Sequence, residues 1–99
     1  MNPHTQRLIG RVVAVCRAYD GTSTTAGFVQ GWASATANAL DSSADTRIAQ
    51  ALQELRNGLE LAFYALPEDD QPSAIKKLIS DFLATIEQLG WSELSEPED

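Results

Sequence analysis

The side chains of this sequence that could carry acid–base, nucleophilic or metal chemistry are one histidine, one cysteine and 14 carboxylates. His4 lies near the start of the chain, and Cys16 shares an apolar helical stripe with Val13 and Tyr19. A thiol buried without a basic neighbour is unreactive, so we expect Cys16 to pack in the core. The sequence has no His/Cys cluster at metal-ligand spacing and no glycine-rich phosphate loop.

The carboxylates fall at expected loops, on polar helix faces and near the end of the chain. The pKa shifts that catalysis needs arise from burial or from close like charges. The one dense acidic run, Glu68-Asp69-Asp70, lies between Pro67 and Pro72, which favours an exposed loop over a catalytic pair. We therefore expect a protein that is not an enzyme and that uses no metal or other cofactor.

Charge is distributed unevenly along the chain, whose net charge is −7. Residues 1–40 carry three Arg and one Asp, a net +2, whereas residues 41–99 carry four basic and 13 acidic side chains, a net −9. An acidic surface repels phosphate backbones, so we expect no direct nucleic-acid binding. Such a surface speeds encounter with a basic protein partner, although acidity can also serve solubility alone.

The length of 99 residues fits one small domain. A single cysteine excludes an internal disulfide, and the beginning of the chain has no signal-peptide pattern. Residues 21–40 contain no charged side chain, but their Ser, Thr, Asn and Gln residues are too polar for a membrane span. We expect a soluble, cytoplasmic protein that does not enter membranes.

Four segments show the apolar periodicity of helices, and no strand alternation separates them. The first is expected to begin near Pro3 and end at Asp20-Gly21, and the second to begin after Ser23-Thr24-Thr25. The third is expected to open with Ser42-Ser43-Ala44-Asp45 and end before Pro67, and the fourth to begin near Pro72-Ser73 and end at Gly90. Short connections make neighbouring helices antiparallel. The sequence predicts an all-α, antiparallel up-down four-helix bundle in residues 1–91, followed by an acidic tail in residues 92–99.

Two sets of apolar residues are expected in the core. In the third segment, a seam repeats at intervals of three and four residues: Ile48, Leu52, Leu55, Leu59, Ala62 and Leu66. The second segment has one expected apolar face, made of Phe28, Val29, Trp32, Ala33, Thr36, Ala39 and Leu40. Of these we expect Phe28, Trp32 and Leu40 in the core, and we expect Gly27 and Gly31 where another backbone passes close by. A small-residue face of that segment either meets solvent or packs on a second copy in a homodimer: Gln30, Gly31, Ser34, Ala37 and Asn38.

Leu61 and Tyr64 lie off the seam of the third segment. One interpretation is that this helix is central and buries more than one face. The other is that both side chains are exposed anchors of a protein interface, ringed by acids and an amide. The second interpretation predicts a partner-binding surface made of Glu54, Asn57, Glu60, Leu61, Tyr64, Glu68, Asp69 and Asp70.

The passage from Gly21 through Thr24 and Thr25 to Phe28 and Trp32 resembles the link between the first two helices of small bacterial immunity proteins. The similar groups are the colicin D immunity-like proteins and the immunity proteins of contact-dependent growth inhibition. The resemblance implies a cytoplasmic inhibitor that occludes the basic active site of a toxin domain, typically a nuclease. The alternative is a small helical adaptor or regulatory subunit whose protein partner is unrelated to toxins.

Overall fold

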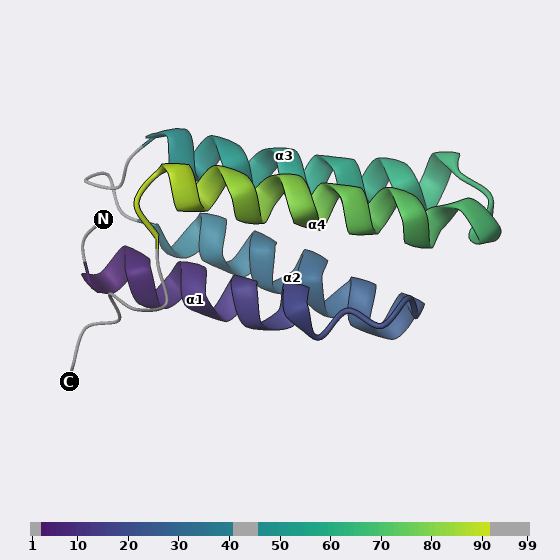
Figure 1. Cartoon of the computed structure of the whole chain (residues 1–99), viewed down its shortest axis with the longest axis horizontal. Coiled ribbons are helices and arrows are strands. Elements are labelled where there is room, and N and C mark those ends of the chain that lie inside the picture. The colour runs from purple at the N-terminus through teal and green to yellow at the C-terminus, as the bar shows by residue number, and fades with distance from the viewer. Residues whose placement is uncertain (1–2, 41–45, 92–99) are drawn as a thin grey trace.

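The computed structural model describes residues 3–40 and 46–91. They form four α-helices, namely α1 (Pro3–Arg17), α2 (Ser23–Ala39), α3 (Thr46–Ala65) and α4 (Gln71–Gln88), with a short 3-10 helix η1 (Glu68–Asp70) before α4. These described residues contain no strand, and Figure 1 shows the four helices side by side along the long axis of the molecule. The prediction of an all-α four-helix bundle is confirmed. The predicted cap at Ser42–Asp45 and the acidic tail at 92–99 lie outside the described residues.

Helix α2 begins earlier than predicted, because Thr22 is its N-cap rather than one of the three residues that follow. Gly21 has a φ of 91°, a left-handed conformation that glycine adopts without a Cβ penalty. The chain then enters an extended Thr22, whose hydroxyl oxygen accepts a hydrogen bond from the backbone N–H of Thr25. The turn and the cap together fix where α2 starts.

The core forms one cluster with contributions from all four helices. The predicted seam of α3 is buried at Ile48, Leu52, Leu55, Leu59 and Ala62. Leu66 is a correction: it is 36% exposed, because α3 ends at Ala65 and the chain turns before Leu66 could continue the stripe. Cys16 is buried in the core, as predicted.

The prediction for the aromatic residues of α2 is wrong. Phe28 is 56% exposed and Trp32 is 40% exposed, and Leu40 is only partly buried against the core. Of the expected apolar face, α2 buries Val29, Ala33 and Thr36, and it adds Ala26, so its buried side chains are the smaller ones. These smaller side chains let α2 pack against both α1 and α3. The guanidinium of Arg11 lies over the Trp32 ring, 5.9 Å from its centroid.

The glycines of α2 do not mark a close helix approach, contrary to expectation. A Cβ added at Gly27 or Gly31 would meet nothing within 4 Å. The close approach is in α3, where a Cβ at Gly58 would lie 2.5 Å from Cδ2 of Leu78 on α4. The absence of a side chain at position 58 therefore allows Leu78 to lie directly over α3.

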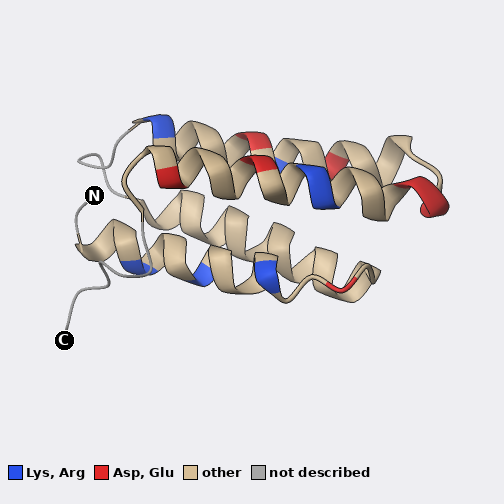
Figure 2. Ribbon diagram, viewed as in Figure 1, with Lys and Arg blue, Asp and Glu red and all other residues tan. Residues whose placement is uncertain are grey.

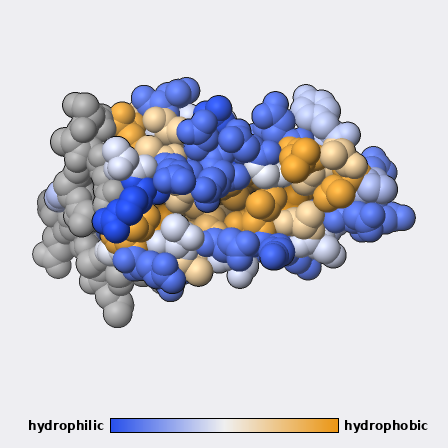
Figure 3. Space-filling view, turned by 90° about the horizontal axis from the view of Figure 1, so that it is seen from above, coloured by the Kyte–Doolittle hydropathy of each residue, from blue (hydrophilic) through white to orange (hydrophobic). Residues whose placement is uncertain are grey.

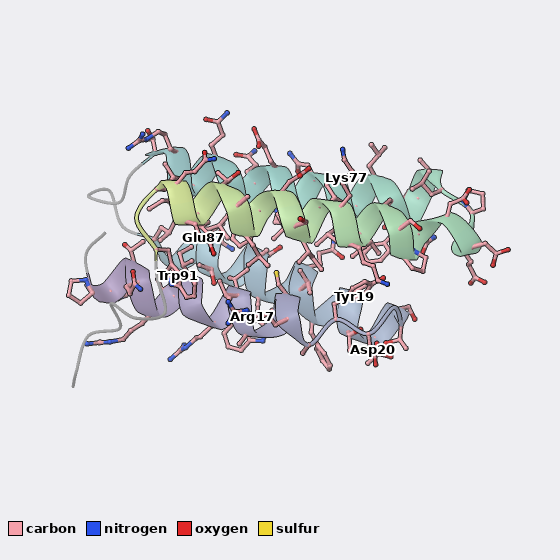
Figure 4. All side chains as sticks on the ribbon, viewed as in Figure 1. Arg17, Tyr19, Asp20, Lys77, Glu87 and Trp91 are labelled. Carbon is pink, nitrogen blue, oxygen red and sulfur yellow. The ribbon has the colours of Figure 1, made fainter. Side chains whose placement is uncertain are left out.

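The end of α4 is joined to α1 through Trp91. Gly90 has a φ of 104°, and the N–H groups of Gly90 and Trp91 donate to the carbonyl oxygens of Glu87 and Ile86, which is the hydrogen-bond pattern of a Schellman cap. The backbone of Trp91 thus returns to the last turn of its own helix, but its side chain does not stay there. The buried indole donates a hydrogen bond of 3.2 Å from Nε1 to the carbonyl oxygen of Gln6 on α1, and it lies between the two helices in Figure 4.

Candidate protein-binding surface on α3 and α4

The single thiol is poorly suited to nucleophilic chemistry. Cys16 is 3% exposed, and desolvation by burial raises the pKa of its thiol to about 12. The reactive thiolate is therefore disfavoured at neutral pH. Within residues 3–40 and 46–91, no group of three or more His, Cys, Asp or Glu side chains is placed to hold a metal ion.

Asp20 has a strongly lowered pKa, and the hydrogen bonds that lower it point to a structural role. Its Oδ1 accepts hydrogen bonds from the hydroxyls of Thr22 and Thr25, at 2.6 and 2.7 Å, and from the backbone N–H of Thr22, at 3.0 Å. These bonds stabilise the ionised form and lower the pKa of Asp20 to about 2. Every one of these donors belongs to the turn that starts α2, so Asp20 stabilises that turn.

All eight residues of the predicted partner-binding surface are exposed: Glu54, Asn57, Glu60, Leu61, Tyr64, Glu68, Asp69 and Asp70. Leu61 is 66% exposed and Tyr64 is 85% exposed. The interpretation in which α3 buries these two side chains in the bundle is therefore wrong. Their exposure is what the interface interpretation requires.

The eight residues lie on one stretch of α3 and on the turn that follows it. Glu54, Asn57, Leu61 and Tyr64 are spaced by three, four and three residues, so they share one face of the helix. Pro67 ends α3, and η1 then places three acidic side chains within a single turn. Figure 2 shows these acids at the end of the bundle where α3 and α4 are connected. Leu61 and Tyr64 thus have acids on both sides along the chain. We call these eight residues the α3 surface.

An apolar hollow of about 440 Å³ lies beside Leu61, between α3 and α4. Its α3 side consists of Gly58, Leu61, Ala62, Ala65 and Leu66, and its α4 side consists of Ala74, Lys77, Leu78 and Asp81. A second hollow of about 120 Å³ continues from Leu78 and Asp81 toward Ala51, Glu54 and Thr85. We call the two hollows together the α3–α4 groove, and Figure 3 shows apolar side chains gathered in a strip along this face.

The spacing of residues in the sequence does not predict the α4 side of this groove, namely Ala74, Lys77, Leu78 and Asp81. Leu78 is only partly buried and packs against the edge of the core. One signal was present in the sequence. Gly58 interrupts an otherwise good helix-forming segment, and such a glycine often has a packing reason.

Charge is divided between the two halves of the bundle. Helix α1 carries three arginines, α2 carries no charge, and the acids concentrate on α3, η1 and α4, as Figure 2 shows. Residues 46–91 carry seven acidic and four basic side chains, a net −3. The remaining six acids of the second part of the sequence fall at 41–45 and 92–99, outside the described residues. The described α3–η1–α4 half is therefore moderately acidic.

A further hollow, of about 220 Å³, lies where the α1–α2 and α3–α4 connections meet. Tyr19, Thr22, Phe63, Glu68 and Gln71 are among its lining residues. The pKa of Tyr19 is raised by desolvation and by the neighbouring charge of Asp20, which keeps its phenol protonated. This hollow lies next to η1 and so adjoins the α3 surface.

No protein-family model matches this chain, and neither does any curated protein or solved structure. No helix within residues 3–40 and 46–91 is long and apolar enough to cross a membrane.

Proposed function

We propose that this protein is an immunity-type inhibitor that binds and neutralises a bacterial toxin domain with a basic active site. The observation that carries the proposal is the exposure of Leu61 and Tyr64, at 66% and 85%, beside the acidic side chains of α3 and η1. An apolar and aromatic centre with a charged rim is the common composition of protein interfaces. The resemblance of residues 21–32 to immunity proteins supports the same function and implies a cytoplasmic location.

In this proposal the apolar and acidic residues of the α3 surface have different roles. Leu61 and Tyr64 become desolvated against the toxin and provide most of the binding energy. Glu54, Glu60 and the three carboxylates of η1 attract a basic surface and speed the encounter. Where the toxin is a nuclease, Glu54 and Glu60 would meet its basic active-site residues in place of substrate phosphates, through charge-assisted hydrogen bonds. The three carboxylates of η1 would stay at the rim of the interface and act on the encounter.

The test is a binding and inhibition assay against the toxin candidate encoded next to this protein's gene. The C-terminal domain of a large secreted protein encoded immediately upstream would be purified and titrated with the wild-type chain. We expect a stable complex and loss of toxin activity at equimolar inhibitor. Tyr64→Ala should weaken binding by about 2 kcal/mol or more if Tyr64 is a hot spot.

Phe28→Ala is the matched control, because Phe28 is an exposed aromatic residue on α2, outside the α3 surface. This variant should bind and inhibit as the wild type does. A toxin domain that neither binds the chain nor loses activity would contradict the proposal. Binding that Phe28→Ala abolishes and Tyr64→Ala leaves intact would place the interface on α2 instead.

A small helical adaptor or regulatory subunit is the second candidate. The α3–α4 groove favours it, because an apolar groove can accept a helix from many kinds of protein and needs no basic active site. The same assay separates the two functions. An adaptor would bind its own partner through this face and leave the toxin candidate active.

A further inference from the structure

We propose that the α3–α4 groove receives a single amphipathic α-helix of the partner protein, with an apolar stripe and a Lys or Arg that meets Glu54 and Asp81. The inference rests on the proposed function in one respect, namely that the partner is the protein that binds the α3 surface. Leu61 belongs to both sites, since it is part of the α3 surface and lines the groove. A helix lying in the groove would therefore also bring its protein against Tyr64.

The shape of the groove fits a short helix. On α4 it extends from Ala74 to Thr85, and the eleven steps between these residues at the α-helical rise correspond to about 16 Å, or three turns. Several lining residues are small, including Gly58, Ala62 and Ala65, so an approaching helix can lie close to the bundle. A helix with large apolar residues at intervals of three and four positions would fill such a groove.

The charges of the groove determine what kind of helix it fits. Glu54 on α3 and Asp81 on α4 line the same hollow from its two sides. Glu54 accepts a hydrogen bond of 3.3 Å from the side-chain amide of Gln50, which leaves its negative charge uncompensated. Two carboxylates lining one hollow favour a cation between them. Lys77, one turn before Asp81, lines the other hollow and gives the groove one positive position.

A small ligand or a second copy fits these observations less well. Small-molecule sites bury most of the ligand surface, whereas the groove is bounded by side chains that are themselves open to solvent: Leu61 is 66% and Leu66 is 36% exposed. A second copy carries the same net charge of −7, so the two chains would repel each other. A basic amphipathic helix satisfies both the open shape and the charge.

The experiment uses the full chain and a synthetic 15-residue peptide with capped ends as the probe. The peptide has Leu at positions i, i+3, i+4 and i+7 and Lys beside that stripe. Two further peptides serve as comparisons, one with the same composition in scrambled order and one with Glu in place of Lys. Fluorescence anisotropy measures affinity, and amide chemical shifts show where each peptide binds. We expect the Lys peptide to bind about tenfold more tightly than either comparison, with shifts at Ala65 and Leu78.

Two pairs of variants locate the site. Ala65→Trp fills the groove and should weaken binding of the Lys peptide by about tenfold or more, the effect expected when one anchor side chain loses its contact. Ala49→Trp places the same side chain at an exposed position of α3 that does not line the groove, and it should have no effect. Asp81→Lys should reverse the preference between the Lys and Glu peptides, whereas Glu87→Lys, exposed on α4 outside the groove, should not.

Equal binding of the scrambled peptide, or unchanged binding by Ala65→Trp, would overturn the inference. So would sedimentation data in which the wild-type chain self-associates and Ala65→Trp does not, because the occupant would then be a second copy. The toxin assay separates this inference from the proposed function. Inhibition that requires Tyr64 but survives Ala65→Trp would leave the function standing without the groove. Peptide binding in the groove without any toxin inhibition would support the groove and contradict the proposed function.

Discussion

Gly58 of α3 and Leu78 of α4 are in such close contact that a methyl group at position 58 would lie 2.5 Å from Cδ2 of Leu78. This contact lies in the middle of the α3–α4 groove, which both residues line. Because Leu78 rests where a side chain at position 58 would otherwise be, Gly58 determines the depth of the groove at this point. Gly27 and Gly31 of α2 have no such neighbour.

Alanine substitution should therefore have different effects at these glycines. Gly27→Ala and Gly31→Ala should each raise the free energy of unfolding by about 0.5–1 kcal/mol, since alanine has the better helix propensity and the new methyl group meets no atom. Gly58→Ala should raise the free energy of unfolding by less than this, or lower it, because the new methyl group must displace Leu78. Urea unfolding of the three variants measures the difference. An equal gain at position 58 would show that Leu78 moves aside at little cost.

Truncation of Leu55 and Leu61 of α3 should change the stability of the protein by very different amounts. Leu55 is 2% exposed, so Leu55→Ala should lower the free energy of unfolding by about 2–5 kcal/mol through lost burial and a cavity. Leu61 is 66% exposed, and Leu61→Ala should change stability by no more than about 0.5 kcal/mol. Thermal melting of both variants is the measurement. A large loss of stability with Leu61→Ala would mean that Leu61 packs in the core instead of lying exposed on α3.

The periodic apolar pattern was sufficient to predict the four helices and most of the α3 seam. Apolar residues at intervals of three and four positions have few other stable arrangements in a chain of this length. The pattern was insufficient for α2, where two stripes compete. Phe28 and Trp32 have the larger apolar side chains, but the stripe containing Ala26 and Ala33 packs inward because its small side chains permit close helix contact.

The candidate surface was predictable only in part, for a related reason. Residues of a single helix face, such as Leu61 and Tyr64, can be grouped from their spacing alone. The α3–α4 groove depends on which faces of two helices meet, and no spacing within one segment contains that information. The contact between Gly58 and Leu78 shows which faces of α3 and α4 meet, and Lys77 and Asp81 lie beside that contact along the groove.

The Asp20 turn should make stability depend on pH in acid. The pKa of Asp20 is lowered from 3.8 to about 2 by hydrogen bonds from Thr22 and Thr25. Its stabilising effect is therefore complete above about pH 4 and is lost as the pH falls toward 2. Asp20→Asn should be less stable than the wild type at pH 6, and the gap should narrow as the pH approaches 2. Urea unfolding across this range measures it.

The same carboxyl can be titrated directly by carbon NMR. Its midpoint should lie near 2 in the wild-type chain, and Thr25→Val should move it upward, toward 3.8, because one hydroxyl donor is removed. A midpoint near 3.8 in the wild type would show that the hydrogen bonds at Asp20 do not persist in solution.

Cys16 should be protected from thiol reagents in the folded protein. Burial raises the pKa of this thiol to about 12 and also blocks access to its sulfur. At pH 8 a disulfide reagent should label the native chain slowly and the urea-unfolded chain quickly. Because Leu55→Ala weakens the core, its native labelling should be faster than that of the wild type. Rapid labelling of the native wild type would contradict the burial of this face of α1.

The acids of η1 should act on the rate of association rather than on the final contact. Glu68, Asp69 and Asp70 are all exposed, and exposed charges contribute little to a formed interface because water and salt screen them. Replacing the three together with Ser should therefore mainly lower the association rate constant for a basic toxin domain. Tyr64→Ala should instead mainly raise the dissociation rate constant.

Surface plasmon resonance at several salt concentrations separates these two effects, and added salt should slow association less in the triple variant than in the wild type. If the triple variant instead dissociates faster and keeps the salt dependence of the wild type, η1 makes direct contact with the partner and the steering charges lie elsewhere.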